Sequence, residues 1–124
     1  MPTTVAELLR IQAETIDPVD RRRLLAHVLG RSASWLYAHA DARVDAPAAA
    51  AYRALLARRQ AGEPVAYLLG RQGFWSLDLE VGPATLIPRP ETERLVELAL
   101  ARLPADAPLS VADLGTGSGA IALA

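Results

Sequence analysis

The sequence predicts three successive parts: an α-helical N-terminal bundle, a β-hairpin link, and the start of an α/β domain. Apolar residues recur at helical spacing up to about residue 60, alternate with polar residues over 77–81, and make up most of a short run over 109–114. These three patterns are typical of amphipathic helices, of a half-buried strand and of a central parallel strand, respectively. The predicted boundaries are residues 1–70, 71–88 and 89–124.

Four helices are predicted in the N-terminal part, and each begins at residues that favour a first helical turn. Hydroxyl and carboxylate side chains can accept hydrogen bonds from the free amides of that turn, and proline suits its first position. Abundant alanine adds helix propensity, and the short connections favour a small antiparallel bundle. The residues that mark these starts are Thr4 with Glu7, Asp17 with Pro18, Ser32 or Ser34, and Pro47.

Aromatic and charged residues of the bundle are first interpreted as structural. Trp35 and Tyr52 are expected in the core. The run 21–23 of three arginines is read as a solvated helix face, with contact to an acidic protein or to RNA as a lesser hypothesis. Two histidines, His27 and His39, have no third ligand at metal spacing, so they are expected to pack or to lie on the surface.

The hairpin follows from strict alternation. Leu77, Leu79 and Val81 would share one face of a strand, with the intervening carboxylates on the other. Adjacent residues of a strand point to opposite faces, so one of Phe74 and Trp75 should be buried. The other would be exposed or would face a ligand pocket. A further helix is predicted from about residue 90, with carboxylates in its first turn.

The composition favours a folded chain and excludes several kinds of site. Hydrophobic residues make up 52% of the 124 residues, and 13 basic and 14 acidic residues give a net charge of −1. This balance gives no reason to expect nucleic acid or an anionic membrane as a partner. There is no cysteine, no signal-peptide pattern, and no apolar stretch of the ~20 residues that span a bilayer. We therefore expect a cytoplasmic protein without a metal site.

The glycine-rich loop after the run 109–114 is the strongest candidate site. Glycines permit a sharp turn and let a ligand approach the backbone, and open α/β folds bind ligands at this end of a strand. Residues 113–119 read D-x-G-x-G-x-G, the first motif of S-adenosylmethionine-dependent methyltransferases, and also satisfy a loose dinucleotide pattern. A tight turn without a ligand is the third interpretation. A phosphate-binding P-loop is excluded, because no Gly-Lys-Ser/Thr follows.

Three stretches together resemble the HemK/PrmC family of release-factor glutamine methyltransferases. They are GEPVAYLLGRQGFWSLDLEV, LIPRPETERLVELAL and VADLGTGSGAIALA, and the segment DPVDRRRLLAHVLGRS is similar to the N-terminal domain of that family. The resemblance covers most of residues 18–124. The PRPETE segment beside an aromatic hairpin is much more specific than the glycine loop.

The resemblance implies a fold, a reaction and a set of site residues. Residues 1–70 would recognise the release factor, 71–88 would be the linking hairpin, and 89–124 would begin a Rossmann-like methyltransferase domain. The enzyme would transfer a methyl group from S-adenosyl-L-methionine to the glutamine amide of a release factor GGQ motif. Asp113 would support the loop. The residues implied to line the cofactor are Gly115, Thr116, Gly117, Ser118 and Gly119, with Arg89, Pro90, Glu91 and Thr92 beside the pocket.

The family pattern also includes an Asn-Pro-Pro-Tyr motif that would bind the target amide, and these 124 residues do not contain it. We therefore expect the sequence to be the front part of a longer enzyme, inactive alone and without a catalytic residue of its own. Residues 105–124 would then be poorly ordered or buried against another chain. Three alternatives stay open: an adenine-N6 nucleic-acid methyltransferase, a non-catalytic module that binds release factor, and an NAD-dependent oxidoreductase.

Overall fold

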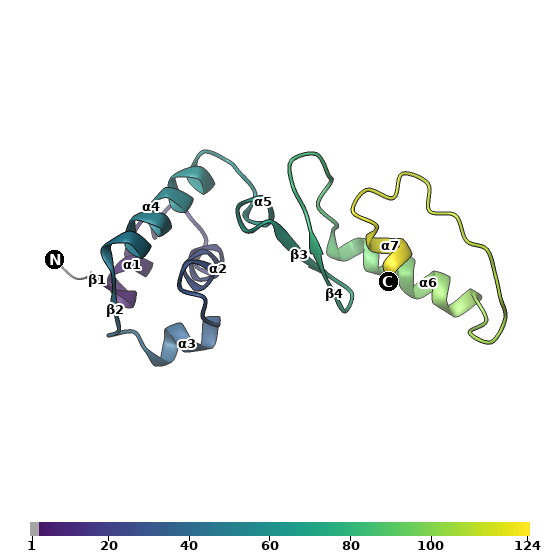
Figure 1. The fold of residues 1–124 in the computed structure, drawn as a ribbon, viewed down its shortest axis with the longest axis horizontal. Helices are drawn as coiled ribbons and strands as arrows, with labels where there is room; N and C mark the ends of the chain where they lie inside the picture. Colours follow the sequence, from purple (N-terminus) through teal and green to yellow (C-terminus); the bar gives the residue numbers. More distant parts are fainter. Residues whose placement is uncertain (1–2) are drawn as a thin grey trace. The chain divides into compact units, whose positions relative to one another are not determined.

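The computed structural model describes residues 3–124 and divides into two units, with the division between Leu69 and Gly70 (Figure 1). The first unit is helical and contains one short antiparallel strand pair. Its elements are β1 (Thr3–Thr4), α1 (Val5–Arg10), α2 (Pro18–Leu29), α3 (Ala33–Ala38), β2 (Arg43–Val44), α4 (Ala46–Gln60) and α5 (Val65–Leu69). The elements of the second unit are β3 (Arg71–Phe74), β4 (Leu77–Glu80), the 3₁₀ turn Pro90–Thr92, α6 (Glu93–Arg102) and α7 (Ala120–Leu123).

The predicted starts of the first three helices are confirmed. The Thr4 hydroxyl accepts the Glu7 amide at 3.2 Å, and a Glu7 carboxylate oxygen accepts the Thr4 amide at 3.0 Å, which completes a capping box. Asp17 caps α2 by accepting an amide at 2.7 Å, with proline in the first helical position. Of the two candidate serines, Ser32 caps α3, accepting an amide at 3.1 Å.

Helix α4 begins earlier than the proline signal predicted. Its cap is Asp45, whose Oδ1 accepts the Ala48 amide at 2.9 Å, and Pro47 occupies the second helical position rather than the first. An aspartate two residues before a proline satisfies the same requirement as one immediately before it, because both place the side chain near the free amides.

Replacing Asp45 with alanine is expected to lower the free energy of unfolding of the first unit by about 1 kcal/mol, because the Ala48 amide loses its acceptor. Chemical denaturation of the wild type and the variant measures the difference. Asp41→Ala is the matched control: it removes the same charge from an exposed position just before β2. Equal destabilisation by both substitutions would contradict the capping role.

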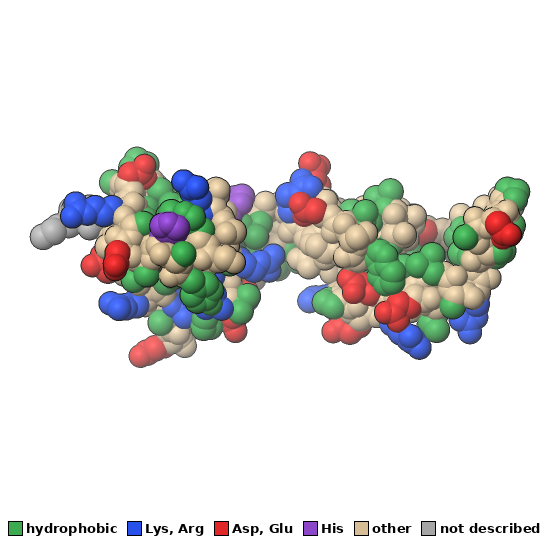
Figure 2. Space-filling view, turned by 90° about the horizontal axis from the view of Figure 1, so that it is seen from below, with side chains coloured by type: hydrophobic (Ala, Val, Ile, Leu, Met, Phe, Trp, Pro, Cys, Tyr) green, Lys and Arg blue, Asp and Glu red, His purple; other side chains and the backbone are tan. Residues whose placement is uncertain are grey.

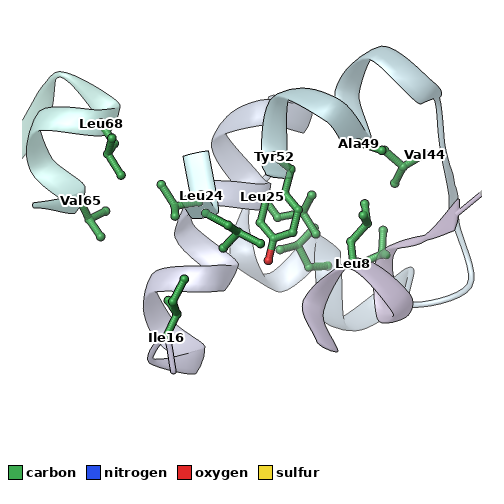
Figure 3. Packing of buried hydrophobic residues seen from close by; sticks show 12 residues of the cluster. Leu8, Ile16, Leu24, Leu25, Val44, Ala49, Tyr52, Val65 and Leu68 are labelled. Atoms are coloured by element: carbon green, nitrogen blue, oxygen red, sulfur yellow. The ribbon is translucent and has the colours of Figure 1, made fainter. Parts of the chain in front are cut away.

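The core of the first unit collects apolar side chains from all five helices and from β2. Tyr52 is fully buried, as predicted, and Figure 3 shows its ring among Leu24, Leu25 and Leu8. Trp35 is only half-buried; it packs on the edge of this cluster and stacks on His39, with ring centroids 4.3 Å apart. The buried members are Val5, Leu8, Ile16, Leu24, Leu25, Leu36, Val44, Ala49, Tyr52, Leu56, Val65 and Leu68.

The interpretation of 21–23 as a uniform solvated face is wrong for Arg21. This side chain is 9% exposed, and its guanidinium donates to the carbonyl of Ile16 at 3.1 Å and to the carbonyl of Leu9. Successive residues of a helix point about 100° apart, and in α2 Arg21 points to the side that faces the core. Arg22 lies over the Tyr37 ring, 5.3 Å from its centroid, and Arg23 is exposed.

The hairpin of the second unit has the predicted alternation. In β4, Leu79 is buried and Leu77 is half-buried, whereas Asp78 and Glu80 are exposed. Of the two adjacent aromatic residues, Phe74 is 1% exposed and Trp75 is 40% exposed, which confirms that one of them is buried. Phe74 packs with Leu79, Val96 and Ala120 in a second, smaller core.

The predicted strand over 109–114 is not formed, so the start of a parallel sheet is not observed. A strand needs a neighbouring strand whose amides and carbonyls bond to its own. Within residues 3–124 the strands form two separate two-stranded sheets, and neither sheet includes residues 109–114. The amides of 109–113 donate no backbone hydrogen bond within the described chain. Residues 90–92 form a 3₁₀ turn, and α6 begins at Glu93 rather than at about residue 90.

Hydrogen exchange is expected to be fast at the amides of 109–113 and slow in the middle of α4. Unpaired exposed amides exchange at nearly the rate of an open chain, whereas amides bonded in a buried helix exchange only on unfolding. Mass spectrometry of the deuterated protein, followed by peptide digestion, measures both segments in one sample. Strong protection of 109–113 would mean that the segment pairs with another strand in solution.

Candidate cofactor-binding loop

The backbone of the glycine loop turns sharply through left-handed conformations. Gly115 and Gly117 have φ values of +69° and +58°, and a Cβ built on either would meet nothing within 4 Å. Glycine is therefore favoured here because other residues would be strained in a left-handed backbone. Lack of space for a side chain is not the reason. The space above both residues is open, so a ligand could lie directly against their peptide groups.

Polar contacts inside the loop fix its shape. The Thr116 hydroxyl donates to a carboxylate oxygen of Asp113 at 2.9 Å, and the Gly119 amide donates to the Thr116 carbonyl at 2.9 Å. Asp113 is half-buried, whereas residues 114–117 are exposed. The carboxylate thus lies at the base of the loop and the glycines form its open rim.

An apolar groove of about 700 Å³ lies beside this loop and shares two residues with it, Asp113 and Leu114. Asp113 is its only ionisable lining residue. Residues of α6, of the segment before the loop and of α7 line the groove, and several of its large aliphatic side chains are exposed to solvent. Its lining consists of Leu95, Val96, Ala99, Leu100, Leu103, Val111, Ala112, Asp113, Leu114, Ile121, Ala122 and Ala124.

The structure does not bring residues 89–92 to the glycine loop. Arg89, Pro90 and Glu91 are exposed, and Thr92 is half-buried. No hydrogen bond or ion pair joins this turn to 113–119 within the described part of the chain, and none of the four residues lines the groove. Their position beside a cofactor stays a prediction.

A contact that the sequence did not reveal involves Glu93. The sequence predicts only that the carboxylates at the start of α6 suit its first turn, but Glu93 Oε1 accepts the Trp75 amide at 2.7 Å. The two residues are 18 positions apart, and no periodic pattern pairs a helix start with a hairpin turn. Only the tertiary arrangement shows the contact.

A family model described as the PrmC N-terminal domain matches residues 4–70, more than half of the chain. The chain belongs to the PrmC N-terminal domain family. The resemblance found in the sequence is thereby confirmed, and the helical first unit is the part that the family model covers.

Several curated relatives of this PrmC-family chain carry the name release factor glutamine methyltransferase. The protein of Xylella fastidiosa strain 9a5c is 53% identical over 124 residues, which cover 100% of this chain and 45% of the relative. The Burkholderia pseudomallei protein is 54% identical over 122 residues, 98% of this chain and 42% of the relative. The Escherichia coli K12 protein is 50% identical over 115 residues, 93% and 41% respectively. The chain thus spans less than half the length of these relatives.

The described residues 3–124 hold no candidate metal site and no membrane-spanning helix. No cluster of three or more histidine, aspartate or glutamate side chains could hold a metal ion in this part of the PrmC-family chain. Among the helices described, none is both long and apolar enough to cross a membrane.

Proposed function

We propose that this chain acts in the methylation of peptide chain release factors in the cytoplasm, on the side-chain amide nitrogen of the GGQ glutamine, with S-adenosyl-L-methionine as donor. The observation that carries the proposal is the identity of about 50% to release factor glutamine methyltransferases along 93–100% of the chain. The alignment with the Xylella fastidiosa protein covers the whole chain, so it includes the glycine loop as well as the helical part.

Each part of the chain has its own role in this proposal. Residues 1–70 hold the release factor, residues 71–88 link the two domains, and residues 89–124 begin the methyltransferase domain. Gly115, Thr116, Gly117, Ser118 and Gly119 receive the methionine and ribose part of the donor. The open space above the glycines and the Asp113–Thr116 bond support this role, because both leave peptide groups free for a ligand.

The transfer step needs more than donor binding. An amide nitrogen is a poor nucleophile, since its lone pair is delocalised, so the enzyme must orient that lone pair toward the methyl group. The resemblance assigns this task to Asn-Pro-Pro-Tyr, which does not occur in the 124 residues. We therefore expect these residues to bind the release factor without transferring the methyl group.

The alternative reaction on adenine has less support. On the face shown in Figure 2, positive and negative side chains are interspersed, without a continuous basic area. Proteins that bind nucleic acid gather arginine and lysine along one face, because phosphate contacts supply much of their affinity.

Calorimetric titration of the 124-residue chain with a release factor tests the proposal, and a single-stranded adenine oligonucleotide is the competing ligand. We expect heat of binding with the release factor and none with the oligonucleotide. Binding of the oligonucleotide alone would favour the adenine reaction. No binding of release factor would remove the recognition role of the helical unit.

A further inference from the structure

The turn of the β3–β4 hairpin carries a residue that its backbone does not favour. Phe74 pairs with Leu77, so Trp75 and Ser76 form a two-residue turn (Figure 1). Trp75 has φ of +57°, and within residues 3–124 the only other non-glycine residue with positive φ is Gln12. Two-residue hairpin turns favour glycine or asparagine at such positions, because a large side chain is strained there.

Two neighbours hold Trp75 in this conformation. The Glu93 carboxylate accepts its amide at 2.7 Å, a charge-assisted bond from the first turn of α6. The preceding Phe74 is fully packed in the small core. The backbone of the turn is therefore fixed from both sides, and strain of this kind persists mainly where function requires it.

Trp75 remains 40% exposed, so complete burial of its side chain does not offset the strain of its backbone. It does not line the groove beside the glycine loop, and no hydrogen bond within residues 3–124 joins it to 113–119. An exposed, rigidly held tryptophan is the kind of side chain that most often dominates a protein–protein interface.

The charges around the turn indicate what kind of surface could cover the indole. Arg71 pairs with Asp78 at 2.8 Å and with Glu80 at 3.7 Å, so this cation is neutralised within the hairpin. Beside the turn, Glu93 accepts the Trp75 amide and Glu91 is exposed, whereas Arg89 is the one exposed cation of this segment, so residues 89–93 carry two negative charges against one positive charge. Such surroundings repel a phosphate backbone and attract a basic protein surface.

We propose that Trp75 is a docking anchor that inserts into an apolar socket, bordered by arginine or lysine, on the protein substrate. This inference rests on the proposed function, in which that substrate is a release factor. Glu93 acts as a positioning residue, because its bond to the Trp75 amide sets the direction of the indole.

The test compares the release-factor affinity and the melting temperature of the 124-residue chain with those of Trp75→Gly. Glycine removes the indole and also relieves the strained backbone, so we expect an unchanged or higher melting temperature together with at least about tenfold weaker binding. Leu98→Ala is the matched control: Leu98 is 38% exposed in the same unit and does not line the groove, so its loss should leave the affinity unchanged.

A second measurement does not depend on how well the glycine variant folds. Trp35→Phe leaves Trp75 as the only tryptophan, and its fluorescence should shift to the blue and resist acrylamide quenching when release factor binds. Two results would overturn the anchor alone. Release factor could bind without changing the Trp75 fluorescence, or Trp75→Gly could bind release factor with the affinity of the wild type. Absence of wild-type binding would overturn the anchor and the proposed function together.

Discussion

Replacing Arg21 with leucine is expected to lower the free energy of unfolding of the first unit by about 2–4 kcal/mol. The Arg21 guanidinium donates to the carbonyls of Leu9 and Ile16, one near the end of α1 and one just before α2. The chain between these helices is irregular, so its carbonyls have no helical partner. Leucine would leave both acceptors without a donor beneath the surface.

Urea denaturation of wild type and Arg21→Leu measures this loss. Arg23→Leu is the matched control, because it makes the same replacement two positions along the same helix at an exposed side chain. We expect the control to change stability by less than about 0.5 kcal/mol. A loss of similar size in both variants would show that the carbonyl contacts of Arg21 contribute little.

Raising the pH from 10 to 12 is expected to destabilise the first unit by about 2–3 kcal/mol more in the wild type than in Tyr52→Phe. Burial raises the pKa of the Tyr52 hydroxyl from 10.0 to about 12, and the nearby Arg21 charge opposes this rise. The unfolded chain therefore releases the phenol proton near pH 10, whereas the folded chain keeps it until about pH 12. The stabilisation is complete below pH 10 and is lost as the pH rises through 12.

Urea denaturation at several alkaline pH values, with Tyr37→Phe as the exposed control, separates this effect from general alkaline unfolding. At neutral pH, Tyr52→Phe should be neutral or slightly stabilising, because the buried hydroxyl has no hydrogen-bond partner among residues 3–124. Parallel pH curves for wild type and Tyr52→Phe would contradict the raised pKa.

Local signals in the sequence predicted the local structure well. Capping by Thr4, Asp17 and Ser32 and the alternation in the hairpin depend on residues a few positions apart, and the structure confirms them. The inward turn of Arg21 and the Glu93–Trp75 bond depend on segments brought together by folding, so no short pattern could show them.

The candidate site was predictable only in part, for a similar reason. The small residues and left-handed turns of 113–119 follow from their own sequence. A parallel strand over 109–114 requires a neighbouring strand, and residues 3–124 offer none. The lining of a cofactor pocket and the place of residues 89–92 in it likewise depend on contacts that a single loop cannot specify.

The core of the first unit has a consequence for the order of events during synthesis. All of its buried members lie between Val5 and Leu68, and the division of the chain follows directly at Gly70. Domains generally fold as units, amino-terminal first, while translation continues. The helical unit can therefore close on the ribosome before the hairpin and the glycine loop have left the exit tunnel, so the part proposed to recognise a translation factor would be the first to become functional.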